Sequence, residues 1–278
     1  MDSRKAFTLV ELLVVIAIIA LLMSILMPAL ARVRKQAKGV LCQANLNQLG
    51  VCFAMYAGDN DGLFMQGWHM ANPPGVKAED IWMEALRPGY GDQGDIRCCP
   101  TAKKPGTEVS GNMYGGDGTF YAWGVFDGGW DPPATPGDYG SYGINGYVQN
   151  PPPQAKIIQD RDTSTNWRTA SVSGAANVPL MTDAQWFGGW PLDTDNPPAF
   201  DGEPWSIDHY DMMRRFCINR HDGFNNCIFL DFSIRKVGLK ELWKLKWHRK
   251  YDINGPWTIE GGVQPDDWPD WMKLFKDY

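Results

Sequence analysis

The segment KAFTLVELLVVIAIIALLMSILMPALARVRKQAK, residues 5–38, carries the strongest structural signal in this chain. It places one acid, Glu11, between a basic cluster and an apolar run over residues 12–31 that only Ser24 and Pro28 interrupt. At about 1.5 Å per residue, a helix over this run is about 30 Å long, which is the thickness of the hydrocarbon core of a bilayer. The run therefore predicts a membrane-spanning helix. The alternative is a secretory signal peptide, whose apolar stretch is shorter, at about 7–15 residues.

Helical periodicity continues beyond the apolar run in a weaker form. Apolar side chains recur at mostly three- and four-residue steps among basic and amide residues, at Val33, Ala37, Val40, Leu41, Ala44, Leu49, Phe53 and Tyr56. The segment GDNDG, residues 58–62, ends the pattern, because Gly and Asn tolerate the left-handed conformation that closes a helix. We therefore expect one helix over residues 7–57, with its first half in lipid and its second half packed on a domain. Pro28 predicts a kink or a melted turn, or else a proline tolerated in the membrane.

We expect residues 58–278 to form a turn-rich domain built around large aromatic rings, as the composition of the whole chain suggests. Aromatic residues make up 13% of the chain, and there are 30 Gly and 20 Pro. We expect a hairpin formed by residues 216–220 and 227–230, and a helix with a basic face over residues 237–250. Near the end of the chain, three rings are expected to fix the C-terminus to the domain: Trp268, Trp271 and Phe275. The formal net charge of −6 gives no electrostatic footprint for nucleic acid.

The segment KAFTLVE, residues 5–11, and the apolar run after it resemble the N-terminus of type IV pilins and type II secretion pseudopilins. In that family, prepilin peptidase removes a short basic leader, and the new amino terminus is methylated. The resemblance implies a leader over residues 1–6, with cleavage and methylation at the junction of Ala6 and Phe7, where Ala6 stands in place of the usual Gly. It also implies an α+β fold, a long N-terminal helix packed on an antiparallel β-sheet domain with long loops. Residues 58–278 then form an extracytoplasmic domain.

A second resemblance covers scattered motifs of the domain, namely CQANLNQLG (42–50), SYGINGY (141–147) and RHDG (220–223). These are similar to the large prepilin-like proteins of planctomycetes, which carry His, nine residues, and then Asp-Gly. His221 and Asp231 keep this spacing, whereas Phe232 replaces the Gly. The resemblance implies architecture more than activity.

Glu11 needs a counter-ion or a hydrogen-bond donor, because a lone carboxylate at the edge of hydrocarbon is costly. Its own helix offers little, whereas cleavage creates a positive amine on Phe7 that can approach Glu11 of the next subunit. The expected partners are therefore other copies or related pilins in a filament, prepilin peptidase, the inner-membrane assembly platform and the lipid bilayer. Four basic residues after the span would alone place the domain in the cytoplasm: Arg32, Arg34, Lys35 and Lys38. The leader outweighs that signal and predicts a single-pass inner-membrane protein with its C-terminal domain in the periplasm or at the cell surface.

The six cysteines of an exported domain suggest disulfides. Cys217 and Cys227 flank the expected hairpin and are the first candidates for a bridge. Cys42 and Cys52 are too far apart on one helix to bridge each other, but either can reach Cys98 or Cys99. Free buried thiols remain the alternative.

No motif for an enzyme, a cofactor or a metal emerges. The four histidines show no close ligand spacing, and neither a nucleophile elbow nor a phosphate-binding loop is present. The segment from Asp59 resembles the start of a calcium loop, but Met70 stands where the twelfth-position acid is needed. His221 is expected to hydrogen-bond within the hairpin.

The sequence therefore predicts a structural subunit of a type IV pilus or a type II secretion-like filament, and no catalysis. The alternative is a membrane-anchored surface module that recognises glycan or another envelope component. Its binding rings would lie in Trp-rich loops such as FGGW, residues 187–190.

Overall fold

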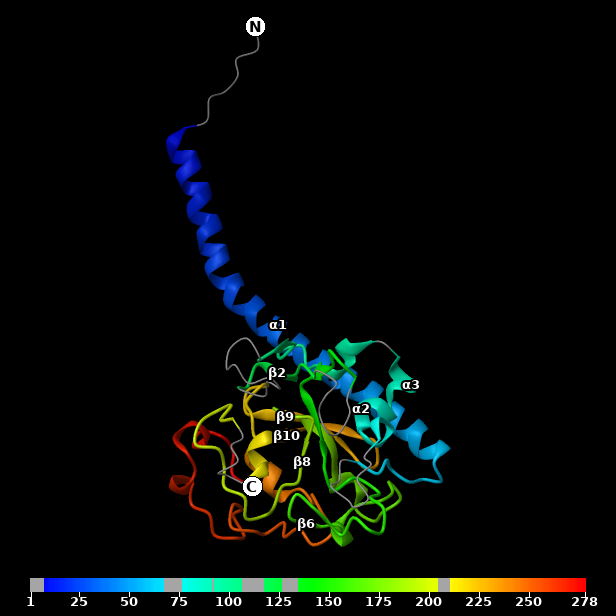
Figure 1. Cartoon of the computed structure of the whole chain (residues 1–278). Coiled ribbons are helices and arrows are strands. Elements are labelled where there is room, and N and C mark those ends of the chain that lie inside the picture. Colours follow the sequence, from blue (N-terminus) through cyan, green and yellow to red (C-terminus); the bar gives the residue numbers. More distant parts are fainter. Residues whose placement is uncertain (1–7, 68–76, 92, 107–117, 127–134, 205–210) are drawn as a thin grey trace.

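The computed structural model describes residues 8–278 except 68–76, 92, 107–117, 127–134 and 205–210. One long helix, α1 (Leu9–Asp59), runs for 51 residues and passes Pro28 without a break. Its outer half projects away from the domain and its inner half lies against it, with a gentle curve between them (Figure 1). The expected helix over residues 7–57 is thus confirmed to within two residues at each end. No melted turn forms at Pro28.

The two halves of α1 differ completely in burial. Every residue from 8 to 38 is exposed. The inner half buries one stripe against the domain, made of Gly39, Cys42, Leu46, Leu49, Gly50, Cys52, Phe53 and Ala57. Of the apolar stripe expected from the sequence, Leu49 and Phe53 are buried, whereas Val33, Val40 and Leu41 are exposed. A step of two residues turns a helix by about 200°, so Val40 lies nearly opposite the buried Cys42.

The main sheet has five strands in the order β10-β9-β7-β4-β8. Its pairs are antiparallel except for β4 with β8, which is parallel. The strands are β4 (Tyr142–Asn145), β7 (Pro179–Asp183), β8 (Gly188–Gly189), β9 (Phe224–Phe229) and β10 (Ile234–Gly238). The inner half of α1 packs on β9 and β10. This is the predicted α+β arrangement of a long helix on a mostly antiparallel sheet.

Short elements and loops surround the sheet. Two small sheets are built from β1 (Lys104–Pro105), β2 (Tyr121–Gly124) and β3 (Tyr139–Gly140), and from β5 (Ile157–Ile158) and β6 (Arg161–Asp162). Of two short α-helices, α2 (Trp82–Ala85) and α3 (Arg87–Tyr90), α3 packs against α1 and α2 packs against α3 (Figure 1). The 3-10 helices are η1 (Ala78–Asp80), η2 (Gly94–Arg97), η3 (Thr163–Thr165), η4 (Ala175–Asn177), η5 (Met212–Arg215), η6 (Lys240–Lys244), η7 (Pro265–Asp267) and η8 (Asp270–Met272).

The prediction of a hairpin around His221 is wrong. The observed hairpin joins β9 to β10, and its turn lies at Asp231 and Phe232. Phe232 adopts a positive φ of 62°, and Asp231 accepts hydrogen bonds from the backbone and hydroxyl of Ser233. Residues 216–220 instead form irregular chain that enters the core, where Arg220 is fully buried.

The prediction of a helix over residues 237–250 is also wrong. Its first two residues belong to β10, and only η6 is helical. The expected basic face does not form there, because Lys240 is buried and pairs with Asp277. The tail packs as expected: Trp268 is buried, with its ring centroid 5.5 Å from that of Trp243.

Candidate functional site

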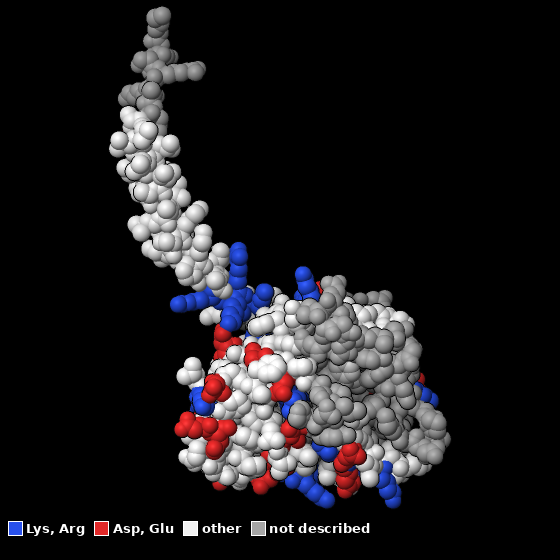
Figure 2. All heavy atoms as spheres, turned by 60° about the vertical axis from the view of Figure 1, so that its left-hand side comes forward, with Lys and Arg blue, Asp and Glu red and all other residues white. Residues whose placement is uncertain are grey.

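The first candidate site is the outer half of α1. Its apolar segment is long enough to span a membrane, and none of it is buried against the domain. Figure 2 shows no charged side chain on the visible face of this half, which meets a collar of Lys and Arg side chains at the domain. The collar follows the span in the sequence and consists of Arg32, Arg34, Lys35 and Lys38. One of them, Lys35, forms an ion pair with Asp222 of the domain.

Glu11 lies in the first turn of α1 and closes a capping box with Thr8. The backbone N–H and the hydroxyl of Thr8 each donate to Glu11 Oε2 at 2.8 Å, and the N–H of Glu11 donates to Thr8 Oγ1 at 3.2 Å. The start of the helix therefore offers this carboxylate more hydrogen-bond donors than the sequence suggested. No ion pair to Glu11 is formed among the residues that the structure describes, so its charge has donors but no cation. The leader, with Ala6 and Phe7, lies outside the described residues.

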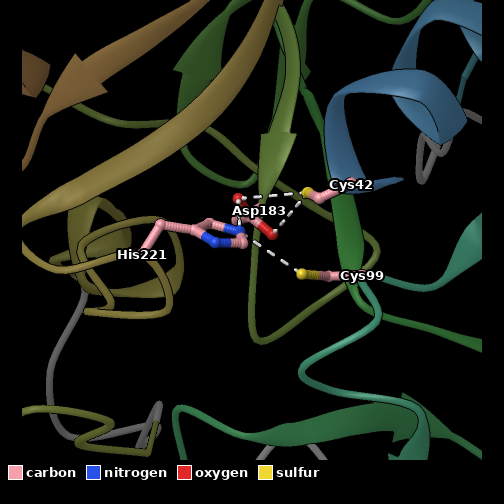
Figure 3. A group of neighbouring side chains, drawn as sticks. All are labelled: Cys42, Cys99, Asp183 and His221. Atoms are coloured by element: carbon pink, nitrogen blue, oxygen red, sulfur yellow. Dashed lines mark hydrogen bonds and ion pairs between the residues drawn. The ribbon is translucent and has the colours of Figure 1, made fainter. Parts of the chain in front are cut away.

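The second candidate site is a buried cluster of ligand-type side chains from four separate parts of the fold (Figure 3). Cys42 belongs to α1, Cys99 follows η2, Asp183 ends β7, and His221 lies in the turn before β9. Cys42, Cys99 and Asp183 are fully buried, and His221 is 8% exposed. Their sulfur, nitrogen and oxygen atoms all lie within 4.8 Å of one another.

His221 is at the centre of this cluster. Its Nε2 lies 3.3 Å from Cys99 Sγ and 3.3 Å from Asp183 Oδ2. Cys42 Sγ lies 3.7 Å from Asp183 Oδ1. The sequence singled out His221 and proposed Cys98 or Cys99 as a disulfide partner of Cys42 or Cys52, but Asp183 was missed. His221 does not hydrogen-bond within a hairpin as expected, and Asp231 serves the β9–β10 turn instead.

Neighbouring polar groups hold the cluster in place. The fully buried guanidinium of Arg220 lies 3.5 Å from Asp183 Oδ1 and donates to the carbonyls of Thr119 and Ala184. The N–H of Asn226 donates to Asp183 Oδ2 at 3.0 Å. The Tyr142 hydroxyl donates to Cys42 Sγ at 3.3 Å.

Burial and hydrogen bonding shift the pKa values of this cluster in opposite directions. Burial lowers the pKa of His221, but its hydrogen bonds to Asp183 and Cys99 outweigh burial and raise the pKa to about 10. Burial raises the pKa of Cys99, but hydrogen bonds to Cys42 and His221, with the charge of Arg220, lower it to about 6. The environment therefore favours a thiolate at Cys99.

The other residues singled out from the sequence serve the packing of the domain. Cys217 and Cys227 are free thiols in this structure, with Cys217 Sγ near Met272 Sδ and Cys227 Sγ directed to the carbonyl of Ile228. A disulfide between Cys217 and Cys227 remains a prediction.

The end of α1 forms as expected. Asp61 and Gly62 adopt positive φ, and the N–H of Gly62 donates to the carbonyl of Ala57.

The proposed sugar-binding rings of the FGGW loop are not at the surface. Phe187 is 4% exposed and Trp190 is 3% exposed. Phe187 packs against Trp123 and Phe126 in the core. These two rings therefore have no face available for stacking on a sugar.

Comparison with known proteins gives information on the N-terminal part of the chain. Residues 1–27 match the family model described as the prokaryotic N-terminal methylation motif. Over 61 residues, the chain is 46% identical to the type IV wide pilus major component PilA4 of Thermus thermophilus. That alignment covers 22% of this chain and 47% of the relative, so the chain spans about half the length of the relative that it matches. No solved structure matches the chain. The chain is thus type IV pilin-like in its N-terminal part.

Proposed function

We propose that this type IV pilin-like chain is a structural subunit of a type IV pilus or a type II secretion-like filament. Prepilin peptidase cuts it before Phe7, the new amino terminus is methylated, and the subunit assembles through α1. The observation that carries the proposal is the outer half of α1, an apolar rod with no partner surface on its own domain, which begins within the methylation motif.

The exposed rod requires two successive environments. Apolar surface is unfavourable in water by roughly 25 cal/mol per Å², so a rod of this length is not left in solvent. Lipid covers it in the inner membrane before assembly, and the rods of neighbouring subunits cover it in the filament. Val33, Val40 and Leu41 support the second environment, because they are exposed and apolar but lie beyond the predicted span over residues 12–31.

Glu11 aligns the subunits in this proposal. In the free chain, its carboxylate accepts hydrogen bonds from Thr8 and lacks a cation among the described residues. In the filament, the cleaved amine of Phe7 of one subunit approaches Glu11 of its neighbour. Water is excluded between packed apolar rods, so the attraction between the two charges is stronger there than in solvent.

In this proposal, the prepilin-like leader outweighs the basic collar in deciding on which side of the membrane the domain lies. The positive-inside rule counts Lys and Arg beside a span, and the collar alone would hold the domain in the cytoplasm. Lys35 is paired with Asp222, however, which indicates that part of the collar serves the contact between α1 and the domain. The proposed location is the inner membrane, with the domain in the periplasm or at the cell surface and the assembly platform as a partner.

The alternative, a membrane-anchored module that binds glycan, is less well supported because Phe187 and Trp190 lie in the core. One experiment separates the two functions. The chain is expressed in a host with an assembly platform, with and without an active prepilin peptidase, and sheared surface material is viewed by electron microscopy. We expect filaments that contain this chain only when the peptidase is active. A stable detergent monomer in both hosts would contradict the proposal and favour the binding module.

A further inference from the structure

We propose that Cys42, Cys99, Asp183 and His221 bind one zinc ion, which fastens α1 to the domain. These are the donor types that zinc prefers, two thiolates, an imidazole and a carboxylate, and four protein ligands make a closed structural site. Sequence spacing alone suggested no metal, since the four residues come from distant parts of the chain.

The distances within the cluster fit a tetrahedral zinc ion. With bonds of about 2.0–2.3 Å, ligand atoms around tetrahedral zinc are about 3.3–3.8 Å apart. Nε2 of His221 lies 3.3 Å from both Cys99 Sγ and Asp183 Oδ2, and Cys42 Sγ lies 3.8 Å from the same Asp183 Oδ2. The side chains converge on one point from four separate parts of the chain (Figure 3).

The same geometry argues against a catalytic Cys-His-Asp arrangement. In a catalytic triad, the nucleophile and the acid contact different ring nitrogens of the histidine. Here Cys99 and Asp183 both approach Nε2, and one N–H cannot point at both. Nδ1 faces α1 instead, where a Cβ added to Gly39 would lie 3.7 Å from it. Convergence on a single nitrogen is what a shared metal ion produces.

The charges around the site balance once zinc is present. Two thiolates and one carboxylate carry three negative charges, and Zn²⁺ with a neutral imidazole leaves one negative charge in excess. Arg220 supplies the compensating positive charge, since its guanidinium is fully buried and lies 3.5 Å from Asp183 Oδ1. The Asn226 amide and the Tyr142 hydroxyl also orient ligand atoms, as groups outside metal ligands do in zinc proteins.

The position of the site gives zinc a mechanical role. Cys42 is the ligand on α1, while the other three come from separate segments of the domain. A zinc ion therefore cross-links the long helix to the domain at the point where α1 leaves it. His221 also forms a wall of a surface pocket with Gly39 and Gln36, so it is the ligand nearest to solvent.

The test begins with the unmodified full-length protein, purified in detergent without chelators. We expect one zinc per chain by metal analysis and, after exchange for Co²⁺, the visible and thiolate charge-transfer absorption of a tetrahedral site with two sulfur ligands. A chain that contains no metal and carries a Cys42–Cys99 disulfide by mass spectrometry would overturn the proposal. So would stoichiometric binding of copper or iron in place of zinc.

Variants add a matched comparison. Cys42→Ser should lose zinc and melt at a lower temperature, whereas His221→Cys, which keeps a ligand atom, should retain zinc. Cys217→Ser is the control, because Cys217 is equally buried but lies outside the cluster. Equal zinc loss in the Cys42 and Cys217 variants would contradict the assignment. The metal content and cobalt spectrum of the unmodified protein decide the question even if Cys42→Ser does not fold.

Discussion

Glu11 and Thr8 form one hydrogen-bonded unit in the free chain, so the capping of α1 and the proposed pairing between subunits have to be separated experimentally. Capping contributes roughly 0.5–2 kcal/mol to a helix. Loss of one partner of a buried ion pair costs more, roughly 3–5 kcal/mol. The two roles therefore predict different losses of free energy when Glu11 or Thr8 is substituted.

Glu11→Ala should leave the protein inserted in the membrane but reduce filament yield severely. A loss of about 3 kcal/mol per subunit contact corresponds to more than about a hundredfold in the assembly equilibrium. The yield is measured by immunoblotting sheared filaments against total membrane protein. Thr8→Ala is the control, because it removes the cap and keeps the carboxylate. Normal filament yield from Glu11→Ala, or an equal defect from Thr8→Ala, would show that Glu11 only caps the helix.

Two glycines test the packing of the domain. A Cβ at Gly146 would lie 2.3 Å from the indole of Trp190, whereas a Cβ at Gly58, near the end of α1, meets nothing within 4 Å. Gly146→Ala should destabilise the domain by about 1–3 kcal/mol through overpacking. Gly58→Ala should be neutral or stabilise by up to about 1 kcal/mol, because Ala favours a helix. Denaturant unfolding in detergent measures both, and a tolerated Gly146→Ala would mean that this contact is wrong.

Among the secondary-structure elements, α1 has an inner half with two apolar faces, one buried and one exposed. One face is buried against the domain and includes Leu49, which is fully buried. The other face carries Val40, which is 65% exposed. We propose that the buried face stabilises the packing of α1 on the domain and that the exposed face contacts neighbouring subunits.

Substitutions on these faces should therefore have opposite effects. Leu49→Ala should lower the free energy of unfolding by about 2–5 kcal/mol, because it leaves a cavity in the core. Val40→Ala should change stability by less than about 0.5 kcal/mol but reduce filament yield. Thermal unfolding and filament immunoblots separate the two effects. If Val40→Ala assembled normally, this face would have no part in the filament.

The helix was predictable from the sequence because its signals are local. Hydropathy, period and the terminal Gly and Asn residues are all read from adjacent positions, and they placed α1 within two residues. The strands were harder, since β4 and β7 are buried on both faces and show no alternation of polar and apolar residues. The segment at 216–220 reads as a strand by composition, but Arg220 donates hydrogen bonds to several backbone carbonyls of the core. Such long-range contacts leave no trace in a local pattern.

In the molecule as a whole, an exposed apolar rod leaves the domain close to a buried polar cluster (Figures 1 and 3). The rod was predictable from residues 5–38. The cluster was predictable only in part: His221, Cys42 and Cys99 stood out by residue type, but Asp183 lies 141 positions from Cys42 and is brought to it by β7. In the proposed filament, load on a domain passes to its rod through this junction.

A processed filament subunit differs from an unprocessed membrane protein at its native N-terminus, and the mass of the N-terminal peptide distinguishes the two. Sheared filaments and membranes from the producing cell are digested, and the N-terminal peptide is identified by mass spectrometry. The account predicts a peptide that begins at Phe7 and carries one methyl group on its amine, with residues 1–6 absent. Recovery of the chain with Met1 retained and an unmethylated amine in all fractions would contradict it.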